Sequence, residues 1–342
     1  VPNPMRIYFF LALVLQAQLT WAQQFQLKSI ETNVNSSLRG LSVVNDQVAW
    51  ISGSAGWVGI STDGGIHWNF NQVKGHESSG FRSLYAFDHN KAIIANAGAP
   101  ANILLTLDAG KTWKTVYSND NEAAFFDGID FWNKNEGLIY GDPIDGKMLL
   151  LKTTDGGHTW NEVVDAPELQ EGEASFAASG TGIRCIDKDK AIISTGGTVS
   201  RLWTTTDKAE TWNAILPPIV QGGAATGIYS FAVNKDNIIL VGGDYTRPEL
   251  ATEHNLYSND NGATWNTPAE SSRGYRECVE FITNKILFTT GPTGTDISYD
   301  GGITWGAFSE IKGFHVLRKA RNGSLIIMAG NDGQISIVHK GK

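Results

Sequence analysis

An eight-residue string that recurs six times constrains this chain more than any other feature of its sequence. Each copy has a hydroxyl residue first, Asp third, a small residue fifth and Trp last, as in TTDGGHTW. A repeat of this length indicates tandem copies of one supersecondary unit that stack on one another to form a shared core. The final residues of the six strings lie 40 to 53 positions apart and are Trp68, Trp113, Trp160, Trp212, Trp265 and Trp305.

The residue types of the string suit a tight hairpin turn. Its Asp can accept backbone N–H bonds within the turn, its fifth residue can take a positive φ, and its Trp opens the next strand and packs inside. Six carboxylates could also form a catalytic or metal array, but their separate turns favour a structural role. The aspartates are Asp63, Asp108, Asp155, Asp207, Asp260 and Asp300, and the fifth residues are Gly65, Gly110, Gly157, Ala209, Gly262 and Gly302.

The string resembles the Asp-box, or BNR, repeat of β-propellers, and the sequence around it fits such a fold. Short runs of alternating apolar or aromatic residues, separated by Gly, Asn and Asp, predict four strands around each copy. After Trp305 only three strands remain, while residues 25–31 form a spare strand near the N-terminus. We therefore predict an all-β, seven-bladed β-propeller of four-stranded antiparallel blades with Asp-box turns, its last blade closed by the N-terminal strand.

The first 22 residues have the pattern of a cleavable export signal. Arg6 precedes nine consecutive apolar residues, 7–15, and small residues occupy the positions before a cleavage site after Ala22. We expect a periplasmic or secreted protein whose residues 23–342 form a single seven-bladed Asp-box β-propeller domain. No later segment is apolar enough for a membrane span.

An alignment of the innermost strands places one polar or charged residue per blade at the same position. In a propeller these strands surround the axial channel, so such residues can converge at one mouth and form an anion site. The alternative is that they make salt bridges between blades, since buried Arg requires partners. Residues 141–147, 165–182 and 242–255 depart most from the repeat and should lie on the same side. The aligned residues are Arg39, Arg82, Asp127, Arg184, Tyr229, Arg276 and His315.

Composition excludes several classes of function. The chain has 27 Lys and Arg against 35 Asp and Glu, which argues against a nucleic-acid partner. Its two cysteines, Cys185 and Cys278, form neither a redox pair nor a zinc motif, and its seven His are scattered. We expect no cofactor and no metal.

The export signal, seven blades, Asp boxes and repeated arginines together resemble the photosystem II stability/assembly factor family, which has relatives in non-photosynthetic bacteria. The resemblance covers residues 25–340 and implies a non-catalytic assembly or scaffold protein whose arginine-rich face receives a partner chain. On this resemblance, the arginines expected on that face are Arg39, Arg82, Arg184 and Arg276. The expected partner is a protein or peptide with exposed carboxylates, or an acidic glycan, bound by a monomer.

A sialidase-like glycoside hydrolase acting on acidic sugars is the rival interpretation, because sialidases share the Asp box. Their chemistry requires arginines on the substrate carboxylate, a Tyr nucleophile activated by Glu, and an Asp acid-base. Tyr229, Glu280 and Asp127 are the catalytic candidates, with Arg184 and Arg276 as carboxylate ligands. The Arg-Ile-Pro string of sialidases is missing and sialidases have six blades, so the sequence favours a protein that is not an enzyme.

Overall fold

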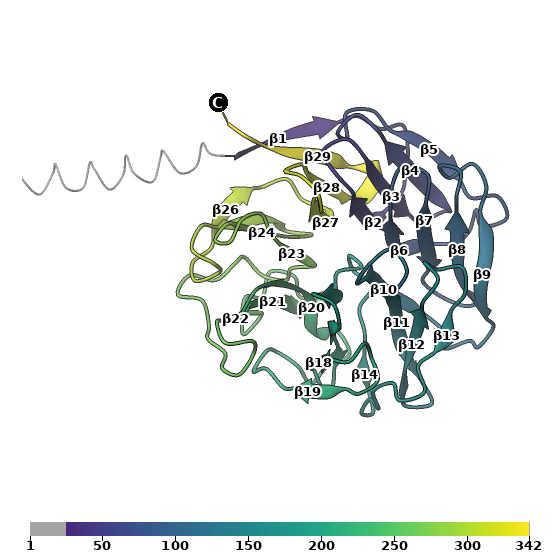
Figure 1. The fold of residues 1–342 in the computed structure, drawn as a ribbon. Coiled ribbons are helices and arrows are strands. Elements are labelled where there is room, and N and C mark those ends of the chain that lie inside the picture. The colour runs from purple at the N-terminus through teal and green to yellow at the C-terminus, as the bar shows by residue number, and fades with distance from the viewer. Residues whose placement is uncertain (1–24, 342) are drawn as a thin grey trace, which may run out of the picture.

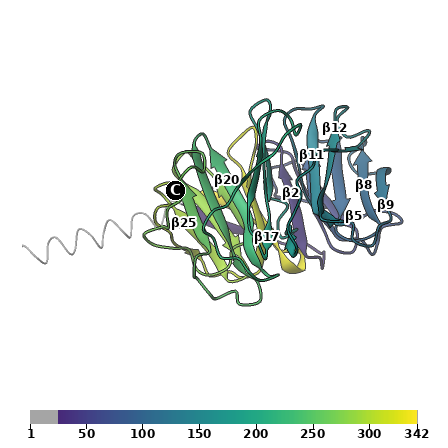
Figure 2. The same ribbon diagram turned by 90° about the horizontal axis from the view of Figure 1, so that it is seen from below.

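The computed structural model describes residues 25–341, which form a closed ring of seven β-sheets around a central axis (Figure 1). The predicted export signal lies outside the described residues. Seen from the side, the strands run across the thickness of the ring (Figure 2). The only helix among residues 25–341 is one short 3-10 turn, η1 (Asn331–Gly333), and no helix there could cross a bilayer.

The first three blades each contain four antiparallel strands, which follow one another from the axis outward. Blade 1 comprises β2 (Leu38–Val43), β3 (Ala49–Gly53), β4 (Trp57–Ser61) and β5 (Asn69–Gln72). Blade 2 comprises β6 (Phe81–Ala86), β7 (Ala92–Asn96), β8 (Ala101–Thr106) and β9 (Lys114–Asn119). Blade 3 comprises β10 (Phe126–Phe131), β11 (Gly137–Ile144), β12 (Lys147–Thr153) and β13 (Asn161–Glu162).

The remaining blades complete the ring. Blade 4 comprises β15 (Ile183–Ile186), β16 (Lys190–Ser194), β18 (Leu202–Thr205) and β19 (Asn213–Ile215). Blade 5 comprises β20 (Thr226–Asn234), β21 (Asn237–Asp244) and β22 (Asn255–Ser258), extended at the axis by β17 (Gly196–Gly197) and β14 (Glu173–Ala174). Blade 6 comprises β23 (Cys278–Phe281), β24 (Leu287–Gly291), β25 (Gly294–Ser298) and β26 (Gly306–Ser309).

Blade 7 confirms the predicted closure. It joins three strands from the end of the chain, β27 (Phe314–Lys319), β28 (Ile326–Gly330) and β29 (Ile335–Lys340), to the N-terminal strand β1 (Phe25–Ile30). β1 pairs with β29 along its whole length, and Figure 1 shows these strands side by side at the rim. Closure leaves no open edge between the first and last blades.

Blade 5 departs from the repeat at its outer edge. Its fourth strand is reduced to one bridge between Tyr257 and Asn266. Beyond Pro268, which has no N–H to offer a ladder, the chain instead bonds to the neighbouring blade, with the N–H of Ala269 donating to the Ile303 carbonyl at 2.8 Å. In blade 5, a contact with blade 6 therefore takes the place of the outermost strand.

The hydrophobic core lies between the blades rather than within a single layer. One cluster joins blades 1 and 2, where Trp50 and Phe81 are buried, and similar clusters join each later pair. The largest cluster spans blades 6, 7 and 1 and includes Phe25 of β1. Because each blade covers its neighbours' apolar faces, stability depends on completing the ring.

The repeated string forms a hydrogen-bonded turn between the third and fourth strands. In blade 3, Asp155 accepts the Thr159 N–H on Oδ1 at 2.9 Å and the Thr159 hydroxyl on Oδ2 at 2.7 Å. Gly157 has φ 85°, and a Cβ there would lie 2.1 Å from Cδ1 of Ile93 in blade 2. Ala209, which replaces Gly in the fourth copy, adopts φ 72°. Each carboxylate is therefore used within its own turn.

The tryptophans of the string lie at the blade interfaces, but not all are buried. Trp160 and Trp305 are 6% and 4% exposed. Trp68, Trp113, Trp212 and Trp265 are half-buried. All six tryptophans therefore pack against the core between the blades, but only two of them are buried.

The turn aspartates should make the fold sensitive to acid. At Asp108 and Asp207, hydrogen bonds from the Thr four residues later, chiefly from its hydroxyl group, lower the pKa of the carboxyl group to about 2. The folded pKa lies below the unfolded value of 3.8, so this stabilisation is complete above pH 4 and is lost between about pH 4 and 2. We expect the free energy of unfolding, measured with urea, to fall steeply in that window.

Asp207→Asn provides the matched comparison. Asparagine keeps the shape of the side chain and does not titrate, so the variant should be less stable than the native chain at pH 7. The stability difference between the two proteins should shrink from pH 4 to 2. A difference that stays constant with pH would contradict the assignment.

Candidate functional site: an axial pocket

The innermost strands present one side chain per blade at an irregularity in their pairing. In five blades a β-bulge falls on a single residue of the inner strand. A β-bulge changes the direction of the side chain that it carries, and β-bulges are common next to functional sites. These five bulge residues are Arg39, Arg82, Asp127, Tyr229 and His315, all members of the aligned set.

The register of blades 4 and 6 differs from the sequence alignment. Arg184 pairs with Ile192 inside the ladder, and Thr181 occupies the equivalent of the bulge position. In blade 6 the pairing of Val279 with Thr289 places Glu277 there, one residue after Arg276. The expectation of four guanidinium groups at the mouth is therefore corrected to two guanidinium groups, from Arg39 and Arg82.

Six of these seven positions line one pocket of about 530 Å³ at the axis. Thr181 is fully buried behind it and donates to Ser230 Oγ at 2.6 Å. The three long insertions add Asp142, residues 175–178 and Tyr245 to the wall, as their position in the sequence predicts. The six lining residues are Arg39, Arg82, Asp127, Tyr229, Glu277 and His315.

One side of the pocket is a connected polar cluster. Arg39 donates through Nη1 to the Ala178 carbonyl at 2.7 Å and to Glu277 Oε2 at 3.2 Å. His315 Nδ1 lies 2.6 Å from the same Oε2, and its Nε2 lies 2.7 Å from Asn331 Oδ1. The positive charge of Arg39 is thus already balanced by a carboxylate from blade 6.

Another side is aromatic, and it joins the polar cluster through Tyr275, whose hydroxyl donates to Glu277 Oε1 at 3.3 Å. Phe176 stacks on Tyr229 with ring centroids 3.8 Å apart, and Tyr275 meets Tyr229 edge-on at 4.6 Å. The Tyr229 hydroxyl donates to the Ala225 carbonyl at 2.8 Å, and burial raises the pKa of this phenol. Tyr245 extends the wall toward solvent and is 55% exposed. This wall offers a flat apolar surface beside the polar groups.

Two ionisable groups at the pocket have no hydrogen bond or ion pair with any other side chain or backbone group of residues 25–341. One is the half-buried guanidinium of Arg82, whose pKa is lowered by desolvation and by the nearby charge of Arg39. The other is the carboxyl group of Asp127, which is fully buried. They extend from the neighbouring inner strands β6 and β10.

Arg184 and Arg276 do not line the pocket. Arg184 pairs with Glu280 at 3.2 Å farther along the channel, and Arg318 pairs with the same carboxylate at 3.3 Å. Arg276 is 0% exposed and pairs with Asp296, which is 1% exposed. Arg184 therefore pairs with a half-buried carboxylate of another blade, as the salt-bridge alternative predicts, whereas Arg276 satisfies a buried carboxylate of its own blade.

The catalytic set required by a sialidase is not assembled. Glu280 binds two arginines and does not line the pocket that contains Tyr229. The Tyr229 hydroxyl is bonded to a backbone carbonyl instead of a carboxylate base. Within residues 25–341, no group of three His, Cys, Asp or Glu side chains is placed to hold a metal ion.

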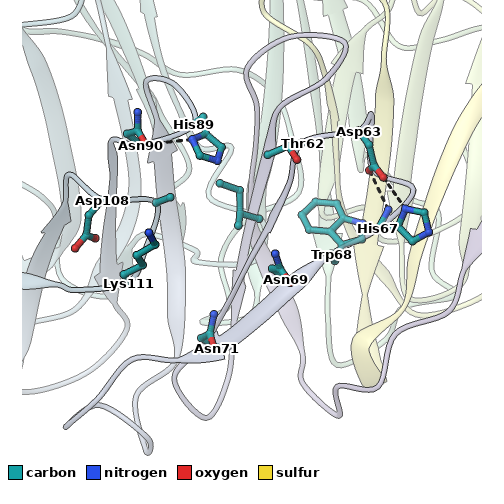
Figure 3. A pocket seen from close by; sticks show the side chains of 12 residues that line it. Thr62, Asp63, His67, Trp68, Asn69, Asn71, His89, Asn90, Asp108 and Lys111 are labelled. Atoms are coloured by element: carbon teal, nitrogen blue, oxygen red, sulfur yellow. Dashed lines mark hydrogen bonds and ion pairs between the residues drawn. The ribbon is translucent and has the colours of Figure 1, made fainter.

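A larger pocket, about 720 Å³, lies on the outer part of blades 1 and 2. Its lining includes Asp63, which accepts the His67 N–H at 3.0 Å, and Asp108, which accepts the Thr112 hydroxyl at 2.6 Å. Figure 3 shows the labelled side chains spread along this groove instead of converging on one point. The axial pocket is therefore the stronger candidate despite its smaller volume.

Comparison with known proteins agrees with this architecture. The solved structure "YCF48 bound to D1 peptide" has a TM-score of 0.64 and 14% identity, covering 92% of this chain and 96% of that one. "YCF48 from Cyanidioschyzon merolae" has a TM-score of 0.66 and 15% identity, covering 92% and 98%. The GH74 xyloglucanase from Xanthomonas campestris has a TM-score of 0.60 and 14% identity, and the match covers 91% of this chain and 53% of that enzyme.

These likenesses establish a shared fold, which hosts both binding proteins and enzymes. A search of curated proteins gave no match. The profile described as "Photosynthesis system II assembly factor YCF48" matches residues 17–121 and 97–230, which together exceed half of the sequence. The chain therefore belongs to the YCF48 family of seven-bladed β-propellers.

Proposed function

We propose that this chain is an exported, non-catalytic binding protein whose axial pocket receives a carboxylate of a partner protein or peptide. The observation that carries the proposal is the unpaired guanidinium of Arg82 at the pocket. Arginine presents a planar fork that matches a carboxylate, and a half-buried fork with no partner among residues 25–341 is ready to bind one. Support comes from the family relative that was solved with a D1 peptide.

The remaining lining fits a peptide better than a sugar hydrolysis site. The stacked rings of Phe176 and Tyr229 supply apolar area in the same pocket as Arg82. Arg39 is held by Glu277 and by a backbone carbonyl, so it positions the wall of the pocket. A carboxylate at Arg82 would leave the adjoining chain against the aromatic side.

Binding can be tested with three matched mixtures of N-acetylated hexapeptides. The first has a free C-terminal carboxylate and no Asp or Glu, the second has a C-terminal amide instead, and the third has the amide plus one internal Glu. The immobilised protein should retain the first or third mixture over the second. Retention of the first indicates a chain end, and retention of the third indicates an acidic side chain. Equal retention of all three mixtures would refute carboxylate recognition.

Arg82→Ala should weaken binding of a retained peptide about tenfold to a hundredfold, the range for a lost charge-assisted hydrogen bond. The midpoint of thermal unfolding should change little, because Arg82 makes no internal hydrogen bond or ion pair within residues 25–341. Arg82→Lys should restore part of the affinity, since lysine keeps the charge without the fork.

Lys188→Ala is the matched control, because it removes one positive charge from an exposed turn between β15 and β16. Calorimetry on the three variants should show loss only for the Arg82 substitutions. Equal affinities for Arg82→Ala and the native chain would show that the partner binds elsewhere.

A further inference from the structure

Among the residues that the structure describes, Asp127 is the one carboxyl group of the pocket without a hydrogen-bond partner. It is 0% exposed, and neither carboxyl oxygen has a hydrogen bond within residues 25–341. The other acids of the pocket are bonded: Asp142 accepts the Ser175 N–H at 2.9 Å, and Glu277 accepts from Arg39 at 3.2 Å. Asp127 therefore stands apart from its neighbours.

Such a group is costly to bury. A polar side chain taken from water without a new hydrogen bond destabilises the fold, and a leucine of similar size would avoid that cost. Asp127 nonetheless sits at the bulge of β10 and lines the pocket. A buried polar group that faces a pocket and has no internal partner is a candidate to bind what enters the pocket.

The surroundings of Asp127 favour its neutral form. Desolvation, and then the charge of Asp142 on β11, raise the pKa of this carboxyl well above 3.8, against the smaller opposing effect of Arg82 on β6. Tyr140, the other titratable group of β11 close to it, is itself buried with its pKa raised. A neutral carboxylic acid carries one O–H donor, which a carboxylate lacks.

We propose that Asp127 is a second ligand-binding residue, which donates its O–H to the same partner carboxylate that Arg82 binds. This inference rests on the proposed function and adds a requirement to it. Arg82 and Asp127 line one pocket from adjacent inner strands, so one planar group can meet both. An ionised Asp127 would repel the ligand, whereas the protonated acid shares its proton with it.

The pairing predicts that binding depends on pH. A bound carboxylate favours the protonated form of Asp127, so affinity is greatest at low pH, above the ligand's own pKa, and falls as rising pH removes the proton. The pocket is also lined by Asp142, which accepts the Ser175 N–H, and by Arg39, Glu277 and His315, which bond to one another. Comparison of Asp127 variants isolates the contribution of Asp127 from theirs.

The test uses calorimetry from pH 5 to 9 with the tightest carboxylate-bearing hexapeptide retained by the immobilised protein. Asp127→Asn replaces the acid with an amide whose N–H donates at every pH, so it should keep the affinity and flatten its pH dependence. Asp127→Leu has no donor and should bind about tenfold to a hundredfold more weakly. Its thermal midpoint should equal or exceed that of the native chain.

Two outcomes would overturn the proposal. One is native affinity in Asp127→Leu, and the other is an Asp127→Asn variant with the pH dependence of the native chain. If Asp127→Leu does not fold, the Asn variant still decides the question. Should Arg82→Ala also bind normally, the carboxylate pocket itself is refuted. If only the Arg82 variant loses affinity, the pocket stands and the role of Asp127 fails.

Discussion

Arg276→Ala is expected to lower the free energy of unfolding by about 3 kcal/mol, the lower end of the range for breaking a buried ion pair. Arg276 is completely buried, and it donates through Nε to Asp296 Oδ2 at 2.9 Å and through Nη1 to Thr293 Oγ1 at 2.7 Å. Its removal leaves the Asp296 carboxylate buried. Arg273 still donates to Asp296 Oδ1 at 2.7 Å, which keeps the loss from being larger.

Urea unfolding at neutral pH measures this effect. Arg247→Ala is the matched control, since that side chain is 66% exposed in its pair with Asp244 and should change stability by less than about 1 kcal/mol. The folded fraction of Arg276→Ala should still bind the peptide, because Arg276 does not line the axial pocket. If Arg276→Ala kept the stability of the native chain but lost peptide binding, Arg276 would instead belong to the ligand-binding site.

The contrast between Arg276 and Arg82 shows how far the sequence can predict this molecule. The repeated turns are local, so their spacing predicts the number of blades, and the leftover strands predict the closure. Side-chain direction at the axis depends on register, and a slip of one residue reverses it. Arg276 and Glu277 are one residue apart: the sequence alignment selects Arg276, whereas the strand pairing of blade 6 puts Glu277 at the pocket.

An alignment on the second strand of each blade identifies the residues that take the bulge position in blades 4 and 6. Blades 4 and 6 lack the aromatic or aliphatic residue that marks the bulge elsewhere, so aligning on that residue selects Arg184 and Arg276. The second strand of each blade, AIIS in β16 and LFTT in β24, is more regular. Counting back from its pairing identifies Thr181 and Glu277. The polar partners of Arg39 and the isolation of Asp127 depend on long-range packing, which no local pattern encodes.

Removal of β1 is expected to have a larger effect than any single substitution. β1 pairs with β29 from Phe25 opposite Lys340 to Ile30 opposite Ile335. Phe25 is 4% exposed and packs edge-on against Phe288 of blade 6 at 5.3 Å, and burial of this ring alone contributes about 2 kcal/mol. Without β1, this contact is lost and β29 becomes an exposed edge.

A chain that begins at Glu31 should therefore unfold at least about 10 °C below one that begins at Phe25, and it should associate in size-exclusion chromatography. Lys28→Glu is the control: it changes a side chain of β1 that faces solvent and should leave the thermal midpoint unchanged. A synthetic peptide of residues 25–34 should restore the midpoint by adding its strand to β29. Equal midpoints for the two chains would mean that the ring does not depend on β1, even though that strand completes the seventh blade.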